Sequence, residues 1–128
     1  MNNTVYKHFG LAPDSEQWLD WRWQYRNRIK TAQELAQILP LTQQQMGDIS
    51  ACLQKFRMAI TPYYASLIDE ADPACPIRMQ AIPTVSEMQV LPGEKSDPLN
   101  EVHNMPAPHI VHRYPDRALF LATHQCAM

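Results

Sequence analysis

Glycine is scarce in this sequence, and the short glycine-containing motifs of several large enzyme classes are missing. Only 3 glycines occur in 128 residues, and they form no glycine-rich phosphate-binding loop. The Gly-x-Ser-x-Gly pattern of serine hydrolases and the His-Glu-x-x-His pattern of zinc proteases are also absent. The sequence therefore gives no motif support for a P-loop nucleotidase, a serine hydrolase or a zinc protease.

Long apolar runs and a strong charge excess are missing as well. The first residues, MNNTVYKHFG, lack the basic start and apolar stretch of a secretory signal, and no later segment approaches about 18 consecutive apolar residues. The formal net charge is only -2, and no run of five like charges occurs. We therefore expect a soluble, cytoplasmic protein that binds neither nucleic acid nor a membrane.

Cysteine and histidine are present in patterns that fit no self-contained site. An odd number of widely spaced cysteines suits neither a secreted disulfide framework nor a zinc site, and favours a reducing compartment. The 3 cysteines are Cys52, expected as a small core or surface residue, Cys75, expected as an incidental loop thiol, and Cys126. The 5 histidines, interpreted as solvated loop residues with a metal-binding protein as the alternative, are His8, His103, His109, His112 and His124.

Helix-starting signals dominate residues 1–91, which we expect to form a helical region. Three capping boxes pair Asp14 with Gln17, Thr31 with Glu34 and Thr42 with Gln45. The first helix is expected to bury one face formed by Trp18, Trp21, Tyr25 and Ile29. Further helices are expected at about 32–39 and 43–57, after Thr61-Pro62, at 77–82 and after Thr84.

Proline punctuates the next segment, and an apolar run follows it. Residues 92–117 carry repeated prolines and are expected to form an extended arm that lies over another surface. The run ALFLATH, residues 118–124, is expected to be a buried strand. Since no second convincing strand is found, this strand is expected to pair with something outside the chain. The fold class is therefore mainly α, with an irregular arm and one terminal strand.

Two arginines bracket a proline turn just before that strand. Guanidinium groups on a constrained backbone bind phosphate or carboxylate through paired hydrogen bonds, so Arg113 and Arg117 form a candidate anion clamp. The alternative is that they are surface arginines paired with Asp116. Tyr114 is able to stack on a planar ligand or to pack beside Pro115. Cys126 lies where a barrel strand would deliver a residue to a catalytic end, although one thiolate holds no cluster.

Four segments, in this order and spacing, resemble the lysine 2,3-aminomutase family. They are WLDWRWQYRNRI at 18–29, RMAITPYYASLID at 57–69, DPACPIRMQAIPT at 72–84 and HRYPDRALFLATHQCAM at 112–128. The resemblance implies an isomerase that moves the 2-amino group of an amino acid to carbon 3. It also implies a [4Fe-4S] cluster that cleaves S-adenosylmethionine to a 5'-deoxyadenosyl radical, and pyridoxal 5'-phosphate that carries the amino group.

The resemblance also assigns roles to particular residues. Cys126 is similar to the first cysteine of the family's Cys-x-x-x-Cys-x-x-Cys cluster motif, and residues 118–128 would begin the α/β barrel of the parent enzyme. Arg113, Tyr114 and Arg117 match the stretch that contacts pyridoxal phosphate. No catalytic residue is assigned within the chain, which is expected to be inactive alone. The helices would flank the barrel and contribute to a homo-oligomer.

Two alternatives remain open at this point. The chain is either part of an aminomutase or a non-catalytic helical interaction module derived from one, and its end inside a cluster motif favours the first. The substrate is expected to be L-lysine, but glutamate and arginine 2,3-aminomutases look alike over this region.

Overall fold

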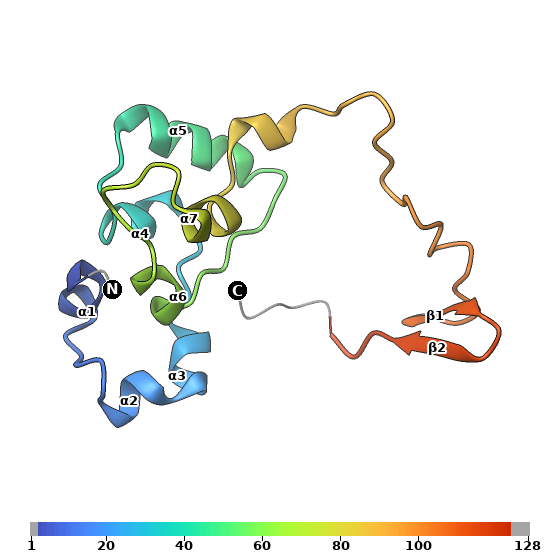
Figure 1. The fold of residues 1–128 in the computed structure, drawn as a ribbon, viewed down its shortest axis with the longest axis horizontal. Coiled ribbons are helices and arrows are strands. Elements are labelled where there is room, and N and C mark those ends of the chain that lie inside the picture. The colour runs from blue at the N-terminus through green and yellow to red at the C-terminus, as the bar shows by residue number, and fades with distance from the viewer. Residues whose placement is uncertain (1–2, 124–128) are drawn as a thin grey trace. The chain divides into compact units, whose positions relative to one another are not determined.

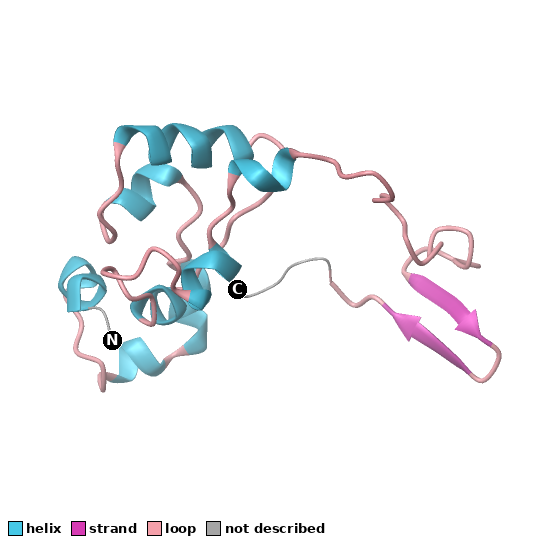
Figure 2. Ribbon diagram, turned by 45° about the horizontal axis from the view of Figure 1, so that its top comes forward, coloured by secondary structure: helices cyan, strands magenta, loops and turns pink. Residues whose placement is uncertain are grey.

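The computed structural model describes residues 3–123, which fall into two compact units (Figure 1). The first unit extends to Gln89 and the second begins at Val90. All helices of the described chain lie in the first unit and both strands in the second (Figure 2). The expected mainly α fold is confirmed, with the addition of a two-stranded sheet. No helix in residues 3–123 is long and apolar enough to cross a membrane.

The helices of the first unit are short and follow one another through tight turns. They are α1 (Asn3–Phe9), α2 (Glu16–Leu19), α3 (Trp21–Arg26), α4 (Ala32–Ala36), α5 (Gln43–Cys52), α6 (Pro62–Ser66), α7 (Pro76–Ala81) and the 3-10 helix η1 (Val85–Met88). Helix α1 packs against α6, and α5 packs against both α4 and η1.

Side-chain caps explain where several of these helices begin. Two of the three expected boxes, Thr31 with Glu34 and Thr42 with Gln45, are formed. In α4 the Glu34 N–H donates to the Thr31 hydroxyl at 3.1 Å, while the Thr31 N–H donates to the Glu34 carboxylate at 3.0 Å. Thr61 caps α6, whose first residue is proline. These starts were readable because a cap is a local interaction.

The prediction of one continuous first helix with Trp21 on its buried face is wrong. The helix is interrupted at Asp20, whose backbone is extended and whose carboxylate accepts the Arg22 N–H at 3.0 Å. A short side-chain oxygen competes here with the helical hydrogen bond, so Asp20 ends α2 and starts α3. Trp21 is consequently 66% exposed instead of buried. The start is also shifted, because Ser15 and not Asp14 caps α2.

One backbone pairing and one buried amide link separate segments around the apolar core of the first unit. Ile29 and Ile60 exchange reciprocal backbone hydrogen bonds of 2.8 and 3.0 Å, and both side chains are buried. The buried Gln24 donates from Nε2 to the Trp18 carbonyl at 2.8 Å and accepts the Tyr63 N–H at 2.8 Å. This amide joins α2 and α3 to α6. The segments before and after α4 and α5 are thereby tied together.

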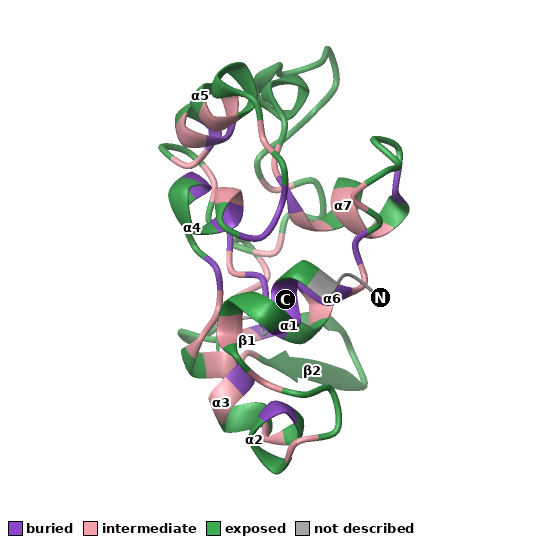
Figure 3. Cartoon of the chain, turned by 90° about the vertical axis from the view of Figure 1, so that its left-hand side faces the viewer, coloured by how far each residue is buried: buried purple, intermediate pink, exposed green. Residues whose placement is uncertain are grey.

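The second unit is a hairpin, which corrects the expected lone terminal strand. Strand β1 (Ile110–Tyr114) pairs antiparallel with β2 (Arg117–Phe120). Strand β2, which was expected to need a partner outside the chain, therefore pairs with β1 of the same chain. Strand β1 lies within residues 92–117, which were expected to form an irregular arm. Strand β2 is also exposed along its length instead of buried (Figure 3). The sequence IVHRY was missed because prolines surround it and polar residues interrupt it.

Replacement of Gln24 by methionine should destabilise the first unit. Methionine keeps the length of the side chain but leaves the Trp18 carbonyl and the Tyr63 N–H without a partner. We expect Gln24→Met to lower the free energy of unfolding by about 2–3 kcal/mol, since each buried group left unpaired costs about 1–3 kcal/mol. Urea denaturation followed by tryptophan fluorescence measures this change.

The matched control is Gln44→Met. Gln44 is exposed and donates to Asp48 at 2.8 Å on the surface of α5. Its loss should change the free energy of unfolding by no more than about 0.5 kcal/mol. Equal effects of the two substitutions would show that the Gln24 amide does not hold the helices together.

Candidate functional site

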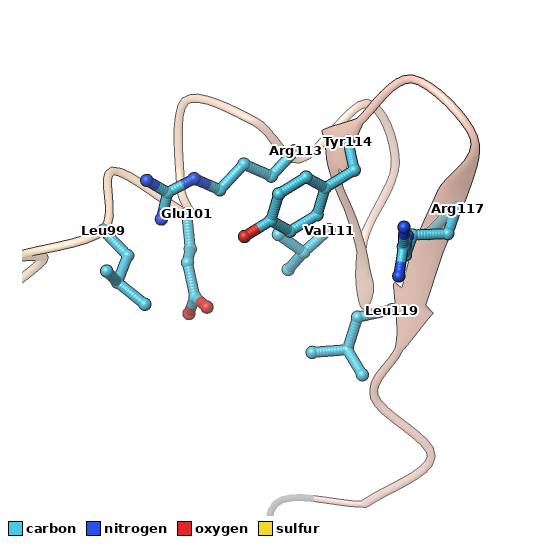
Figure 4. A pocket seen from close by; sticks show the side chains of 8 residues that line it. Leu99, Glu101, Val111, Arg113, Tyr114, Arg117 and Leu119 are labelled. Atoms are coloured by element: carbon cyan, nitrogen blue, oxygen red, sulfur yellow. The ribbon is translucent and has the colours of Figure 1, made fainter.

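The second unit contains a pocket of about 290 Å³ beside the hairpin (Figure 4). Its lining comes from both strands and from the loop that precedes them. The lining residues are Leu99, Glu101, Val111, Arg113, Tyr114, Arg117, Ala118 and Leu119. All three residues expected to bind a phosphate-bearing cofactor, Arg113, Tyr114 and Arg117, therefore line one pocket.

An irregularity in β1 brings neighbouring side chains to this pocket. In a regular strand, Arg113 and Tyr114 would point to opposite faces of the sheet. The register is instead Val111 opposite Leu119 and Tyr114 opposite Arg117, with a shift between Val111 and Tyr114. Such a bulge re-aims side chains and is common next to binding sites. It accounts for the presence of both Arg113 and Tyr114 in the pocket lining.

A two-residue turn positions the second arginine. Tyr114 and Arg117 are paired across the turn formed by Pro115 and Asp116. Proline fixes its own φ angle, so the turn holds the ends of the two strands together. The Arg117 guanidinium lies over the Tyr114 ring, with 5.5 Å between the guanidinium carbon and the ring centroid. Figure 4 shows Arg113 and Arg117 on either side of Tyr114.

Asp116 pairs with Arg117 at the edge of the pocket. Arg117 donates from Nε to Oδ1 at 3.1 Å and from a terminal nitrogen to Oδ2 at 3.0 Å. The alternative read from the sequence, an arginine paired with Asp116, is thus realised for Arg117. Both side chains are well exposed, at 72% and 65%, and such pairs contribute only about 0–1 kcal/mol. A phosphate is therefore able to compete for this guanidinium.

The loop before the hairpin supplies the remaining wall of the pocket. Leu99 and Glu101 come from this loop, and Figure 4 shows their side chains on the same side as Arg113. Sequence reasoning missed both residues because their position depends on the folded loop. The available signal was Asp97-Pro98 followed by Asn100, which is typical of a turn.

The Asp97 carboxylate organises that loop. It accepts the Glu101 N–H at 2.8 Å and the Val102 N–H at 2.9 Å. Hydrogen bonds from the backbone N–H groups of Val102, Glu101 and Asn100 hold the pKa of Asp97 below its usual value. Hydrogen bonding of this kind favours the ionised carboxylate, and the loop is built around that charge.

The cysteines and histidines form no site in the described part of the chain. Cys52 is buried, in agreement with one of its two expected placements. Cys75 lies in the loop before α7, as expected, but its side chain is only 4% exposed and belongs to the core. Backbone N–H groups of Arg78 and Asp69 lower the pKa of the Cys75 thiol. Within residues 3–123 no three histidine, cysteine or acidic side chains gather as metal ligands. Cys126, the expected cluster ligand, and His124 lie outside the described residues.

Most polar groups of the pocket fit a phosphate group, and the pocket does not by itself fit an iron–sulfur cluster. Two guanidinium groups and a phenol are hydrogen-bond donors suited to phosphate oxygens, and the exposed ring of Tyr114 offers a planar surface. The Glu101 carboxylate in the same lining only accepts hydrogen bonds and has the same sign of charge as a phosphate. A cluster requires several thiolates, and the described residues of this unit contain no cysteine. The pocket therefore suits a planar, phosphate-bearing ligand.

Comparison with known proteins places these features in a family. No family model matches the sequence. The chain is 48% identical to L-lysine 2,3-aminomutase of Clostridium subterminale over 128 residues, which is all of this chain and 30% of that protein. It is 49% identical over 113 residues to L-lysine 2,3-aminomutase of Acetoanaerobium sticklandii, covering 88% of this chain and 27% of that protein.

A relative with a different printed substrate is also similar. The chain is 41% identical to glutamate 2,3-aminomutase of Clostridioides difficile over 118 residues, covering 92% of this chain and 28% of that protein. The chain thus spans less than a third of the length of the curated relatives it matches. With identities of this size along its whole length, the chain belongs to the lysine 2,3-aminomutase family.

Proposed function

We propose that the full-length protein carrying this sequence is an amino-acid 2,3-aminomutase that moves the 2-amino group of L-lysine to carbon 3. The observation that carries the proposal is the meeting of Arg113, Tyr114 and Arg117 in one pocket. Lysine is preferred because five of the similar relatives are named L-lysine 2,3-aminomutase, at 39–49% identity, whereas one, at 41%, is named for glutamate. Residues 1–91 would flank a barrel begun by residues 118–128, joined by the arm at 92–117.

The pocket residues are proposed to hold pyridoxal 5'-phosphate by its phosphate. Arg113 and Arg117 would donate to the phosphate oxygens from two sides, and the Tyr114 ring would fix the plane of the cofactor. When bound, pyridoxal phosphate would carry the migrating amino group of the substrate. The task of this chain's residues is to bind and orient, so the position of the phosphate sets the position of the reacting end.

The use of a [4Fe-4S] cluster and S-adenosylmethionine is proposed only because the chain resembles the aminomutase family. Cys126 would supply one thiolate of a [4Fe-4S] cluster, and the other thiolates would come from the rest of the parent enzyme. No such set of ligands gathers within residues 3–123. We further propose that the 128-residue chain is inactive alone, and that the full-length enzyme is a cytoplasmic homo-oligomer.

A non-catalytic interaction module is the second candidate function. Leu19 and Trp21 are 70% and 66% exposed at the corner between α2 and α3. Exposed apolar side chains of this size are candidates for protein contacts. The two functions differ in whether the full-length protein carries out chemistry on an amino acid.

Replacement of either pocket arginine should weaken cofactor binding by the full-length protein. Hydrogen bonds to charged groups contribute about 1.5–3 kcal/mol, so Arg113→Ala and Arg117→Ala should each raise the Kd for pyridoxal 5'-phosphate about 10- to 100-fold. Titration followed by the absorbance of the cofactor measures the Kd. Excess inorganic phosphate should compete with the cofactor in the unmodified protein and less in the variants.

Arg22→Ala is the matched control for these substitutions. Arg22 is exposed and stacks on the neighbouring Trp21 ring at 4.7 Å, much as Arg117 stacks on Tyr114, but it lies in the first unit. This variant should bind the cofactor as the unmodified protein does. Unchanged affinity in both pocket variants would rule out the proposed phosphate site.

Activity with three amino acids tests the proposed reaction and its substrate. Under anaerobic, reducing conditions with S-adenosylmethionine and pyridoxal phosphate, the full-length protein should convert L-lysine to β-lysine faster than it converts L-glutamate or L-arginine. The 128-residue chain should give no product, because it lacks the thiolates that a cluster needs. Mass spectrometry of derivatised amino acids measures the products. Absence of turnover with all three substrates in a cluster-loaded protein would favour the interaction module.

A further inference from the structure

One wall of the pocket depends on a side chain that does not line it. Asp97 is absent from the lining, yet its carboxylate accepts the backbone N–H of Glu101 at 2.8 Å and that of Val102 at 2.9 Å. Glu101 is a lining residue, and Leu99 lies between Asp97 and Glu101 in the chain. The carboxylate therefore fixes the backbone on which the wall is built.

The same loop is fastened to strand β1 by Asn104. The Asn104 N–H donates to the Glu101 carbonyl at 3.0 Å, and its side-chain amide donates to the Asn100 carbonyl at 2.8 Å. The Asn104 carbonyl in turn accepts the His112 N–H at 2.8 Å. His112 precedes Arg113 in β1. A continuous chain of hydrogen bonds thus links Asp97 to the strand that presents the first pocket arginine.

Apolar burial contributes little to holding the loop closed. Leu99 is 52% exposed and Val102 is 75% exposed. Asn100 adopts a φ of 55°, a left-handed conformation that is uncommon outside glycine and needs support from its surroundings. Hydrogen bonds to an ionised carboxylate are among the stronger ones in proteins. The order of this loop therefore depends mainly on Asp97 and Asn104.

We propose that Asp97 is a positioning residue of the phosphate pocket, which holds Leu99 and Glu101 in place in the pocket lining without touching the ligand. The proposal rests on the proposed function of that pocket. An ordered wall fixes the shape of the pocket before a ligand binds, so less conformational freedom is lost on binding. Loss of the carboxylate opens the wall and weakens phosphate binding while Arg113, Tyr114 and Arg117 remain in place.

Two substitutions and a matched control in the full-length protein test this inference. Asp97→Ala removes both acceptor oxygens and should raise the Kd for pyridoxal 5'-phosphate roughly 5- to 50-fold, within the range seen when residues that support a ligand shell are replaced. Asp97→Asn keeps one acceptor and should give a smaller increase. The control is Asp72→Ala, since Asp72 also accepts a backbone N–H, that of Ala74 at 2.8 Å, but lies in the first unit.

A second readout separates positioning from a general loss of structure. The amide NMR signals of Glu101 and Val102 should shift in both Asp97 variants, whereas those of β1 should stay dispersed. The lowered pKa of Asp97 predicts the pH dependence in the unmodified protein. A lowered folded-state pKa stabilises the loop at pH above the ordinary aspartate value of about 3.9, and this contribution is lost as pH falls through the lowered pKa. The two amides should therefore titrate below about pH 3.9, and not in Asp97→Asn.

The outcomes distinguish this inference from the proposed function. An unchanged Kd in Asp97→Ala, with weakened binding in Arg113→Ala and Arg117→Ala, would overturn the positioning role and leave the phosphate site intact. Unchanged binding in all of these variants would remove the proposed function itself. If Asp97→Ala loses the β1 signals, Asp97→Asn decides: weaker binding with intact β1 signals supports the inference, and unchanged binding contradicts it.

Discussion

The antiparallel pairing of β1 with β2 is the constraint on which the candidate site depends. It places Arg113 and Tyr114 near Arg117, although a proline turn and an acidic residue separate the strands. The shift in register between Val111 and Tyr114 is equally necessary, since strict alternation would place one of the two neighbours on the other face. The strands supply the donors, and the loop anchored by Asp97 supplies the remaining wall. The pocket therefore arises from backbone geometry more than from side-chain packing.

Local signals explain which parts of the fold were predictable. The caps at Thr31, Thr42 and Thr61 were read correctly because each involves residues within one helical turn. The break at Asp20 was missed because the apolar spacing around it fits a continuous helix equally well. The burial of Gln24 could not be predicted from the sequence either, because its second hydrogen-bond partner, Tyr63, is distant in the sequence. The sequence was enough to predict which segments are helical. Where a helix is interrupted, and which of its side chains are buried, depended on contacts with other parts of the fold.

The sequence was enough to select Arg113, Tyr114 and Arg117 as candidate ligand contacts, but not to predict the strand and loop that form the rest of the pocket. Two arginines around a proline turn indicate anion binding by their chemistry, and the resemblance to a known family sharpened this interpretation. The partner strand was missed because IVHRY alternates poorly and stands among prolines. Leu99 and Glu101 were missed because they reach the pocket only through the Asp97 turn. A loop closed by backbone hydrogen bonds leaves little hydrophobic pattern for sequence reasoning to detect.

The sparse burial in the second unit also has a thermodynamic consequence. Among its described residues, 90–123, Val111 is the one buried hydrophobic side chain. The heat-capacity increment of unfolding arises mainly from apolar surface that becomes exposed to water. Opening of the hairpin and its loop should therefore change the heat capacity little, in contrast to unfolding of the helical unit with its apolar core. The heat-capacity change recorded by calorimetry should therefore report the helical unit and be almost insensitive to the state of the pocket beside the hairpin.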